Sequence, residues 1–437
     1  MLPQKILLIT RMKSQNAGNE ALSAELINLI EDLNPKAEFR VMDRYPRFLQ
    51  QFTIASLRRY ARKNKGSDSL IDGFEYLSQT IINKYSGKSE GLEKIASAND
   101  AFVDLHIAHK PSLVKSIKRK IGIRKNLCKF GFIEKENLPI CINTISNWAD
   151  QIIWNPAGEI HPTGDNNEVM RLLLLMRIAQ LSGKKTAIVN HSLEVSDQDL
   201  EELIRYVYGN STGVIYRDSP SCNESARIAI PEKIIKESSD VVFIASKSND
   251  IIMPPPQEKF LSGTICLAIN GLEAYNGHDS WDWLFDNLKS LNRPIAFLSN
   301  AMNHDIKFAQ KYSDKYEINI VNRQPNYKEI QGFYKNIDLL ISSRLHSSIL
   351  ALCQSVPVVT IEPSMFKLTA IFDQLDYPIK TVNLNEKNWS EKVLENVNTA
   401  LDNREKIGDI GHKLAISKAN SVYEDYDSLF NQLRISD

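Results

Sequence analysis

The stretch NIDLLISSRLHSSILALCQSVPVVTIEPS, residues 336–364, constrains the fold of this chain more than any other. Ile337 to Ile341 is apolar except for one aspartate and predicts a strand, and Val356 to Ile361 predicts a second strand. The residues between them predict a helix that Ser342 and Ser343 can cap. Together these segments predict one βαβ unit, the building block of a parallel α/β sheet.

Arg344 and His346 lie in the first turn of that predicted helix. In βαβ units, ligands bind beyond the carboxyl ends of the strands, where helix N-termini direct amide hydrogens and a positive dipole at anions. An arginine fork and a titratable imidazole suit a small anion that carries a carboxylate or a phosphate. The spacing alone is equally compatible with a solvent-facing arginine or a structural ion pair.

The wider pattern favours the anion site. The run from Ser342 to Pro357 resembles the C-terminal signature of the polysaccharide pyruvyl transferase family, which reads Ser-x-Arg-Leu-His, then an Ile/Ala/Leu-rich helix, then a Val-Pro strand. The matching residues are Ser342, Arg344, Leu345, His346, Ile349, Leu350, Ala351, Leu352, Val356 and Pro357.

Other segments extend the resemblance. QNAGNEAL, residues 15–22, is similar to the family's Asn-x-Gly-Asp-Glu turn, with Asn19 where aspartate is usual. VIYRDSPS, residues 214–221, is similar to the family's Arg-Asp-x-x-Ser segment. NPAGEI, residues 155–160, stands where the family usually has a Gly-rich turn. The resemblance covers most of the chain except roughly residues 45–145.

The predicted fold class is α/β, with two Rossmann-like domains in a GT-B-like arrangement and the site in the interdomain cleft. Residues 1–253 are the predicted N-terminal domain, with a basic, mostly helical insertion at about 45–145. Residues 257–437 are the predicted C-terminal, donor-binding domain with a C-terminal helix. Met253 precedes three consecutive prolines, which stiffen an extended linker between the domains.

Two predictions concern the ends of these domains. Asp240 to Ala245 is predicted to be the strand that closes the first sheet. Arg404 to Leu433 is predicted to be largely helical, with interruptions at Gly408 and Gly411, and in folds of this shape such a tail can cross back to brace the first domain.

Composition excludes several classes of protein. The formal net charge of the 437 residues is zero, which does not indicate a nucleic-acid-binding protein. Five cysteines without C-x-x-C spacing indicate reduced thiols in a cytoplasmic protein and argue against a zinc site. The N-terminal apolar run stops at Thr10, too short for a signal peptide, and no apolar run approaches a membrane span.

A basic amphipathic segment lies within residues 110–130. Leu113, Ile117 and Ile121 share one face between lysines and arginines. Such a helix can bind peripherally to an anionic membrane, here the inner membrane face, although charge runs are more often solvated surfaces.

Further candidate site residues come from the N-terminal half. His191 and Arg217 both follow predicted strands, so both should lie at carboxyl ends facing the cleft. Gly18 permits close approach of the backbone to a ligand, and Asn16 and Glu20 can hydrogen-bond a sugar hydroxyl.

The resemblance implies transfer of pyruvate from phosphoenolpyruvate to two hydroxyls of one sugar, with formation of a cyclic ketal and release of phosphate. The acceptor would belong to a bacterial-type polysaccharide (exopolysaccharide biosynthesis) or to its lipid-linked precursor. Arg344 and Arg217 would grip the donor, helped by Leu345 and Ser343, and His346 is the first candidate for general acid, with His191 the second. The scheme requires neither a metal nor a cofactor besides the donor substrate.

Three alternatives remain open from the sequence. A GT-B glycosyltransferase that uses a nucleotide-sugar would share the fold, with Glu362 as the nearby carboxylate for the donor ribose. A sugar epimerase of similar architecture lacks the same donor signature. A catalytically inactive glycan-binding relative would keep the cleft, and Asn19 and the altered turn at residues 155–158 favour it.

Overall fold

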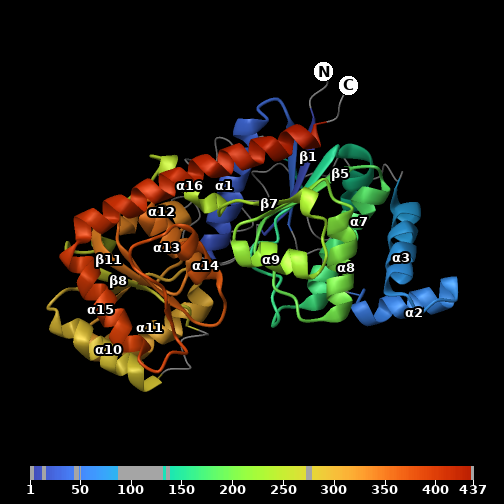
Figure 1. Ribbon diagram of the computed structural model, residues 1–437. Helices are drawn as coiled ribbons and strands as arrows, with labels where there is room; N and C mark the ends of the chain where they lie inside the picture. Colours follow the sequence, from blue (N-terminus) through green and yellow to red (C-terminus); the bar gives the residue numbers. More distant parts are fainter. Residues whose placement is uncertain are drawn as a thin grey trace.

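The structure is a computed structural model that describes residues 4–11, 16–43, 49, 51–86, 131–133, 138–271 and 278–434. Two parallel sheets, each flanked by helices, lie side by side (Figure 1). The predicted α/β class with two Rossmann-like units is therefore confirmed. The domain boundary at residues 253–257 stays a prediction, since the first sheet ends at Glu237 and the second begins at Thr264.

The first sheet has the strand order β3-β2-β1-β4-β5-β6-β7. Its strands are β1 (Lys5–Thr10), β2 (Glu38–Asp43), β3 (Gly131–Ile133), β4 (Gln151–Trp154), β5 (Lys185–His191), β6 (Gly213–Tyr216) and β7 (Ile235–Glu237). The helices around it are α1 (Ala17–Leu33), α2 (Ile54–Lys65), α3 (Leu70–Tyr85), α6 (Leu138–Asn143), α7 (Asn166–Leu181), α8 (Gln198–Gly209) and α9 (Ser219–Arg227), with the π-helix η5 (Thr144–Trp148) and the 3₁₀ turn η6 (Glu232–Ile234).

The second sheet has the order β10-β9-β8-β11-β12-β13. Its strands are β8 (Thr264–Ala268), β9 (Ile295–Phe297), β10 (Asn319–Ile320), β11 (Ile337–Ser342), β12 (Val358–Glu362) and β13 (Val382–Asn383). Its helices are η8 (Pro256–Glu258), α10 (His278–Ser290), α11 (Met302–Tyr316), α12 (Tyr327–Tyr334), α13 (Leu345–Leu352), α14 (Lys367–Gln374), α15 (Trp389–Asp402) and α16 (Arg404–Leu433).

The βαβ unit predicted from residues 336–364 is present as β11, α13 and β12. Both strands are almost entirely buried and pair in parallel, with Ser342 opposite Thr360. Burial on both faces explains why these strands read as continuous apolar runs rather than as alternating ones. The unit places the loop after Ser342 at the carboxyl edge of the sheet, where a ligand site was expected.

The prediction of a strand over Asp240 to Ala245 is wrong. These residues enter the 3₁₀ helix η7 (Val241–Lys247), and the seventh strand is β7. The Asp240 carboxylate accepts a hydrogen bond from the Val242 amide (3.0 Å), which turns the chain out of the extended conformation. The apolar run is buried in the core that α1 and α13 share, so it carries no periodicity to distinguish helix from strand.

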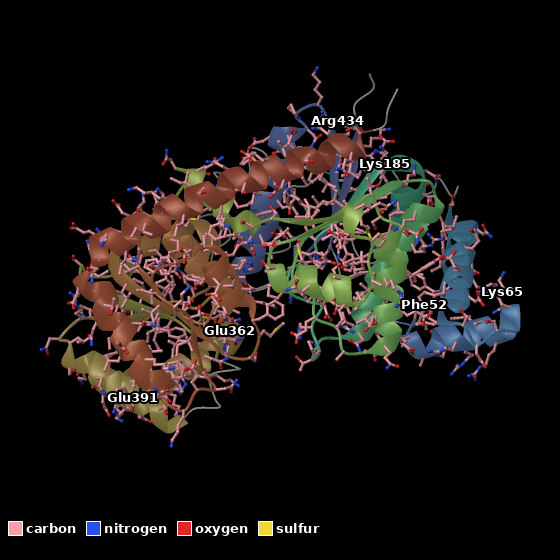
Figure 2. The ribbon with its side chains drawn as sticks, in the orientation of Figure 1. Phe52, Lys65, Lys185, Glu362, Glu391 and Arg434 are labelled. Carbon is pink, nitrogen blue, oxygen red and sulfur yellow. The ribbon has the colours of Figure 1, made fainter. Side chains whose placement is uncertain are left out.

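Helix α16 spans both units, as predicted for the C-terminal tail (Figure 1). Near its start, Gly408 packs against the backbone carbonyl of Ser355 in the second unit. Near its end, the Lys185 amino group of β5 donates to the carbonyls of Gln432 (2.9 Å) and Arg434 (2.6 Å), and Figure 2 shows Lys185 and Arg434 together. The helix therefore fastens the second unit to the first.

Within residues 45–145, the predicted insertion, the helices α2, α3 and α6 are present as expected, but Gly131–Ile133 forms the edge strand β3 of the first sheet. The basic segment 110–130, for which membrane contact was predicted, lies outside the described residues. Within the described ranges, no helix is both long and apolar enough to cross a membrane.

Candidate functional site

A cleft of about 240 Å³ is lined by residues from both sheets. The first unit contributes Arg11, Asn16, Asn19, Ala157, Gly158, Glu159 and Arg217, and the second contributes Asn270, Asn300, Ser343, Arg344, Leu345, His346, Glu362, Pro363, Ser364, Met365, Lys367 and Leu368. The predicted binding residues Arg217, Arg344, Leu345, Ser343 and Asn16 therefore lie around one hollow, together with His346.

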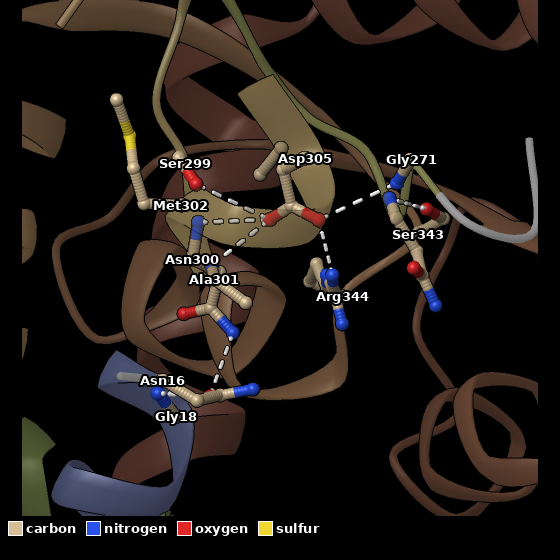
Figure 3. Close-up of polar contacts among 12 residues, drawn as sticks. Asn16, Gly18, Gly271, Ser299, Asn300, Ala301, Met302, Asp305, Ser343 and Arg344 are labelled. Atoms are coloured by element: carbon tan, nitrogen blue, oxygen red, sulfur yellow. Dashed lines mark hydrogen bonds and ion pairs between the residues drawn. The ribbon is translucent and has the colours of Figure 1, made fainter. Parts of the chain in front are cut away.

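Arg344 is held from behind by a buried aspartate (Figure 3). It is the N-cap of α13, and its guanidinium pairs with Asp305 in the first turn of α11. Asp305 also accepts hydrogen bonds from the backbone amides of Asn300 (3.1 Å) and Ala301 (3.0 Å), so its position is fixed. The Nε of Arg344 is buried and has no hydrogen-bond partner within the described part of the chain.

Arg217 follows β6 and is only 2% exposed. Its Nε donates to Ser192 Oγ (3.0 Å) and its Nη1 to Asp240 Oδ2 (2.8 Å). Its Nη2 points toward Gly158, since a Cβ built on that glycine would lie 3.2 Å away from Nη2. Two of the three guanidinium nitrogens of Arg217 are thus anchored, and the third, Nη2, faces the cleft wall.

His346 meets the same aspartate from the second unit. Its Nε2 lies 3.4 Å from Oδ2 of Asp240, which thereby touches both Arg217 and His346. Burial acts to raise the pKa of Asp240, but the charges of His346 and Arg217 and the Val242 amide hold that pKa well below its ordinary value. Asp240 is therefore a buried carboxylate that orients one candidate site residue from each unit.

The N-terminus of α1 packs directly on this arrangement. Asn16 caps the helix by accepting from the Gly18 amide (2.9 Å), and Asn300 Nδ2 donates to the same oxygen (3.2 Å) across the cleft. A Cβ on Gly18 would lie 2.5 Å from Nδ1 of His346. Gly18 does not line the cleft, and the close approach that it permits is toward the imidazole of the other unit, whereas the sequence had suggested an approach to a ligand.

Two further contacts cross or border the cleft. Lys367 Nζ donates to the Gly158 carbonyl (2.8 Å), which joins the start of α14 to the turn after β4. Arg11 pairs with Glu159 (2.8 Å) at the edge of the first unit. Residues 155–158 thus approach charged groups closely although the turn has a single glycine.

Glu362 ends β12 and is 5% exposed, on the side of the second unit that faces the first (Figure 2). One carboxylate oxygen accepts the Thr369 amide (2.8 Å) in the first turn of α14. Burial raises the pKa of Glu362 to about 7, against the lowering effect of the Thr369 and Leu368 amides. This carboxyl changes charge near neutral pH, unlike an ordinary glutamate.

The placement of two predicted residues disagrees with their expected roles. His191 is fully buried beneath the site, with Nε2 3.1 Å from the hydroxyl of Tyr208, and it does not line the cleft. Burial and then the charge of Arg217 lower its pKa to about 3, so it stays neutral and out of reach of a substrate. Glu20 also lies outside the cleft lining, on the partly exposed face of α1.

The expected capping of α13 by Ser342 and Ser343 is wrong. Arg344 is the N-cap residue, without a side-chain capping bond. Ser342 Oγ accepts the Arg344 amide (3.0 Å), and Ser343 Oγ accepts the Asn270 amide (2.7 Å) beyond β8. The serines shape the loop that presents Arg344 instead of ending the helix.

The sequence did not reveal the aspartates behind the two arginines. Asp240 was assigned to a strand, and Asp305 was not singled out. Lys367 also escaped notice. Asp305 lies four residues after Ala301, in the first helical turn, where an acidic residue complements the positive end of the helix dipole. This position could have drawn attention to Asp305, but it does not identify the arginine with which Asp305 pairs.

Comparison with known proteins places the fold. The chain resembles a putative UDP-N-acetylglucosamine 2-epimerase from Listeria monocytogenes (TM-score 0.56, 10% identity, 98% of this chain and 97% of that one). It also resembles Anabaena Alr3699/HepE in complex with UDP (TM-score 0.54, 8% identity, 97% and 100%). A glycosyltransferase from Rickettsia africae has TM-score 0.53 and 10% identity over 100% of both chains. These likenesses confirm the predicted GT-B-like arrangement.

Sequence comparison identifies the family. A search of curated proteins found no significant match. The model of the polysaccharide pyruvyl transferase family, however, matches residues 16–364, which include the α1 turn, Arg217 and the whole β11-α13-β12 unit. The chain belongs to the polysaccharide pyruvyl transferase family.

Proposed function

We propose that this protein transfers the pyruvyl group of phosphoenolpyruvate to a pair of hydroxyls on one sugar of a bacterial-type polysaccharide or of its lipid-linked precursor. The products are a cyclic pyruvate ketal and phosphate. The single observation that carries the proposal is the meeting of Arg217 and Arg344, from different units, around one cleft that also contains His346.

The donor carries a carboxylate and a phosphate on three carbons, so it needs cationic groups on two sides. Arg344 from the second unit, and Arg217 through the end directed at Gly158, supply guanidinium groups from opposite walls. Both guanidiniums are anchored by buried aspartates, which fixes their orientation before the donor binds. Leu345 and Ser343 border the same space.

Protonation of the donor's methylene carbon makes its C2 electrophilic, and His346 is the proposed proton donor. Its imidazole lines the cleft beside Asp240, which can orient the ring. Asn16, at the cap of α1, borders the acceptor side of the same cleft. We propose that the reaction takes place in the cytoplasm, where phosphoenolpyruvate is made, including at the inner membrane face when the acceptor is lipid-linked.

The direct test measures phosphate release from phosphoenolpyruvate by the purified protein with a panel of oligosaccharides. We expect Arg344→Ala and His346→Ala each to lower the rate by about 100-fold or more. Arg404→Ala is the matched control, because Arg404 also pairs with an aspartate of the second unit but does not line the cleft. Equal rates for Arg344→Ala and the wild type would contradict the proposal.

Ligand-induced stabilisation separates the proposal from its main rival. Phosphoenolpyruvate should raise the melting temperature of the wild type and much less that of Arg344→Ala. UDP-sugars should have no effect. Stabilisation by UDP-sugars alone would favour a nucleotide-sugar glycosyltransferase instead.

A further inference from the structure

Glu362 is a cleft carboxyl that the proposed donor site does not use. It ends β12, next to β11, whose carboxyl end presents Arg344. Its carboxylate accepts the Thr369 amide (2.8 Å), which holds it in position in the wall of the cleft. Among the described residues, Glu159 is the one other acidic residue that lines the cleft, and it pairs with Arg11.

The chemistry of ketal formation needs a proton acceptor as well as a donor. Two sugar hydroxyls add to the same carbon, and each must lose its proton as its C–O bond forms. A donor histidine cannot accept the first of these protons before it has delivered its own. When the first hydroxyl attacks C2 while the methylene carbon is being protonated, a second group of useful basicity near C2 is needed to take the hydroxyl proton.

We propose that Glu362 accepts the proton of the first attacking sugar hydroxyl and later returns it to the departing phosphate, an inference that rests on the proposed function. His346 gives a proton to the methylene carbon, and the hydroxyl oxygen bonds to C2 while its proton moves to Glu362. The bond between C2 and the bridging oxygen of the phosphate group then breaks. Phosphate leaves with the electron pair of that bond and takes the proton from Glu362. The second hydroxyl bonds to C2, and its proton restores His346.

The surroundings of Glu362 suit this exchange. Burial raises its pKa to about 7, which makes it a stronger base than an ordinary carboxylate and still leaves much of it ionised at neutral pH. Lys367 is the charged group that acts on it from α14. The other charged and titratable groups around the cleft are Arg11, Glu159, Arg217, Arg344 and His346.

Glu362 could also serve only to accept the backbone hydrogen bond at the start of α14. A substitution must separate this structural role from the proposed role in proton transfer. Glu362→Gln keeps an acceptor oxygen for the Thr369 amide but cannot take up a proton, so it isolates the proton-transfer role. Glu386→Gln is the matched control. Its carboxylate likewise accepts a backbone amide, that of Asn383 (3.2 Å), but it does not line the cleft.

The experiment measures phosphate release and phosphoenolpyruvate-induced stabilisation for the three proteins between pH 5.5 and 9. We expect Glu362→Gln to retain its melting temperature and its stabilisation by phosphoenolpyruvate, with KM within about threefold and kcat lowered by about 100-fold or more. In the wild type, kcat/KM should fall as the pH drops below about 7, because the base must be ionised. That fall should be absent in Glu362→Gln and unchanged in Glu386→Gln.

The possible failures are distinguishable. A Glu362→Gln variant that retains the wild-type kcat and pH profile overturns the role of Glu362 and leaves the proposed function intact. A wild type that neither binds phosphoenolpyruvate nor releases phosphate overturns both. A wild type stabilised by UDP, with that effect lost in Glu362→Gln, overturns both and assigns Glu362 to a nucleotide ribose.

Discussion

Gly18 is the position where a single methyl group would most directly disturb the site. A Cβ there would lie 2.5 Å from Nδ1 and 3.0 Å from Cβ of His346, and 3.1 Å from the capping oxygen of Asn16. Non-bonded heavy atoms reach optimal contact at about 3.5–4.0 Å, so the imidazole in Gly18→Ala must retreat by about 1 Å. Because a ring turn cannot move the Cβ of His346, part of this shift must come from the backbone of α13 or α1.

The two expected effects of Gly18→Ala differ in size. Overpacking costs about 1–3 kcal/mol, whereas alanine in place of a helical glycine contributes about 0.5–1 kcal/mol of stability. The free energy of unfolding should therefore fall by only about 0–2.5 kcal/mol. A displacement of about 1 Å at a reacting group costs about 100-fold in rate. Phosphate release should consequently suffer far more than stability.

The assay pairs urea unfolding with phosphate release, and Gly209→Ala is the control. Gly209 ends helix α8, and its added Cβ would find its nearest neighbour at 3.7 Å, an ordinary contact. Gly209→Ala should keep the activity and lose no stability. If Gly18→Ala retained full activity, His346 would not need its present position, and the assignment of the proton donor would be refuted.

Three further predictions concern buried groups behind the cleft and the long helix. Asp240→Asn breaks the buried pair with Arg217, so we expect a loss of about 3–5 kcal/mol in urea unfolding and weaker stabilisation by phosphoenolpyruvate; unchanged stability would contradict the bridging role. Burial holds the pKa of His191 at about 3 against 6.5 for the exposed side chain, so folding stability is retained above pH 6.5 and lost as the pH falls toward 3. Between these pH values, His191→Phe should lower the dependence of the free energy of unfolding on pH by about 1.4 kcal/mol per pH unit, as measured by unfolding at pH 6 and pH 4. The same pH dependence in the variant and the wild type would refute the buried, neutral state of His191. Gly408→Ala should lower stability by about 1–3 kcal/mol, since its Cβ would overlap a backbone carbonyl of the second unit, and an unchanged melting temperature would show that α16 is not seated as described.

Local sequence predicted elements well where one physical signal dominated. The buried strand β11 and the helix α16 were expected within a residue of their bounds, because long apolar or periodic runs leave few alternatives, although α16 runs through Gly408 and Gly411 without the expected interruptions. The strand prediction for the segment after Asp240 was wrong because no single signal dominated there. Complete burial on all sides removes periodicity, and one side-chain hydrogen bond decided for a 3₁₀ helix.

The sequence by itself determined the α/β class, the loop that carries Arg344 and His346, and the family to which these residues point. These depend on contacts between residues close in the chain, such as the Ser342 hydroxyl and the Arg344 amide. The meeting of Arg217 and Arg344 at the cleft was expected from the sequence and is confirmed. Only the tertiary structure decided that Asp240 touches both Arg217 and His346, and that His191 does not reach the cleft. Burial and charge pairing are set by residues far apart in sequence, and no local pattern records how two sheets are brought together.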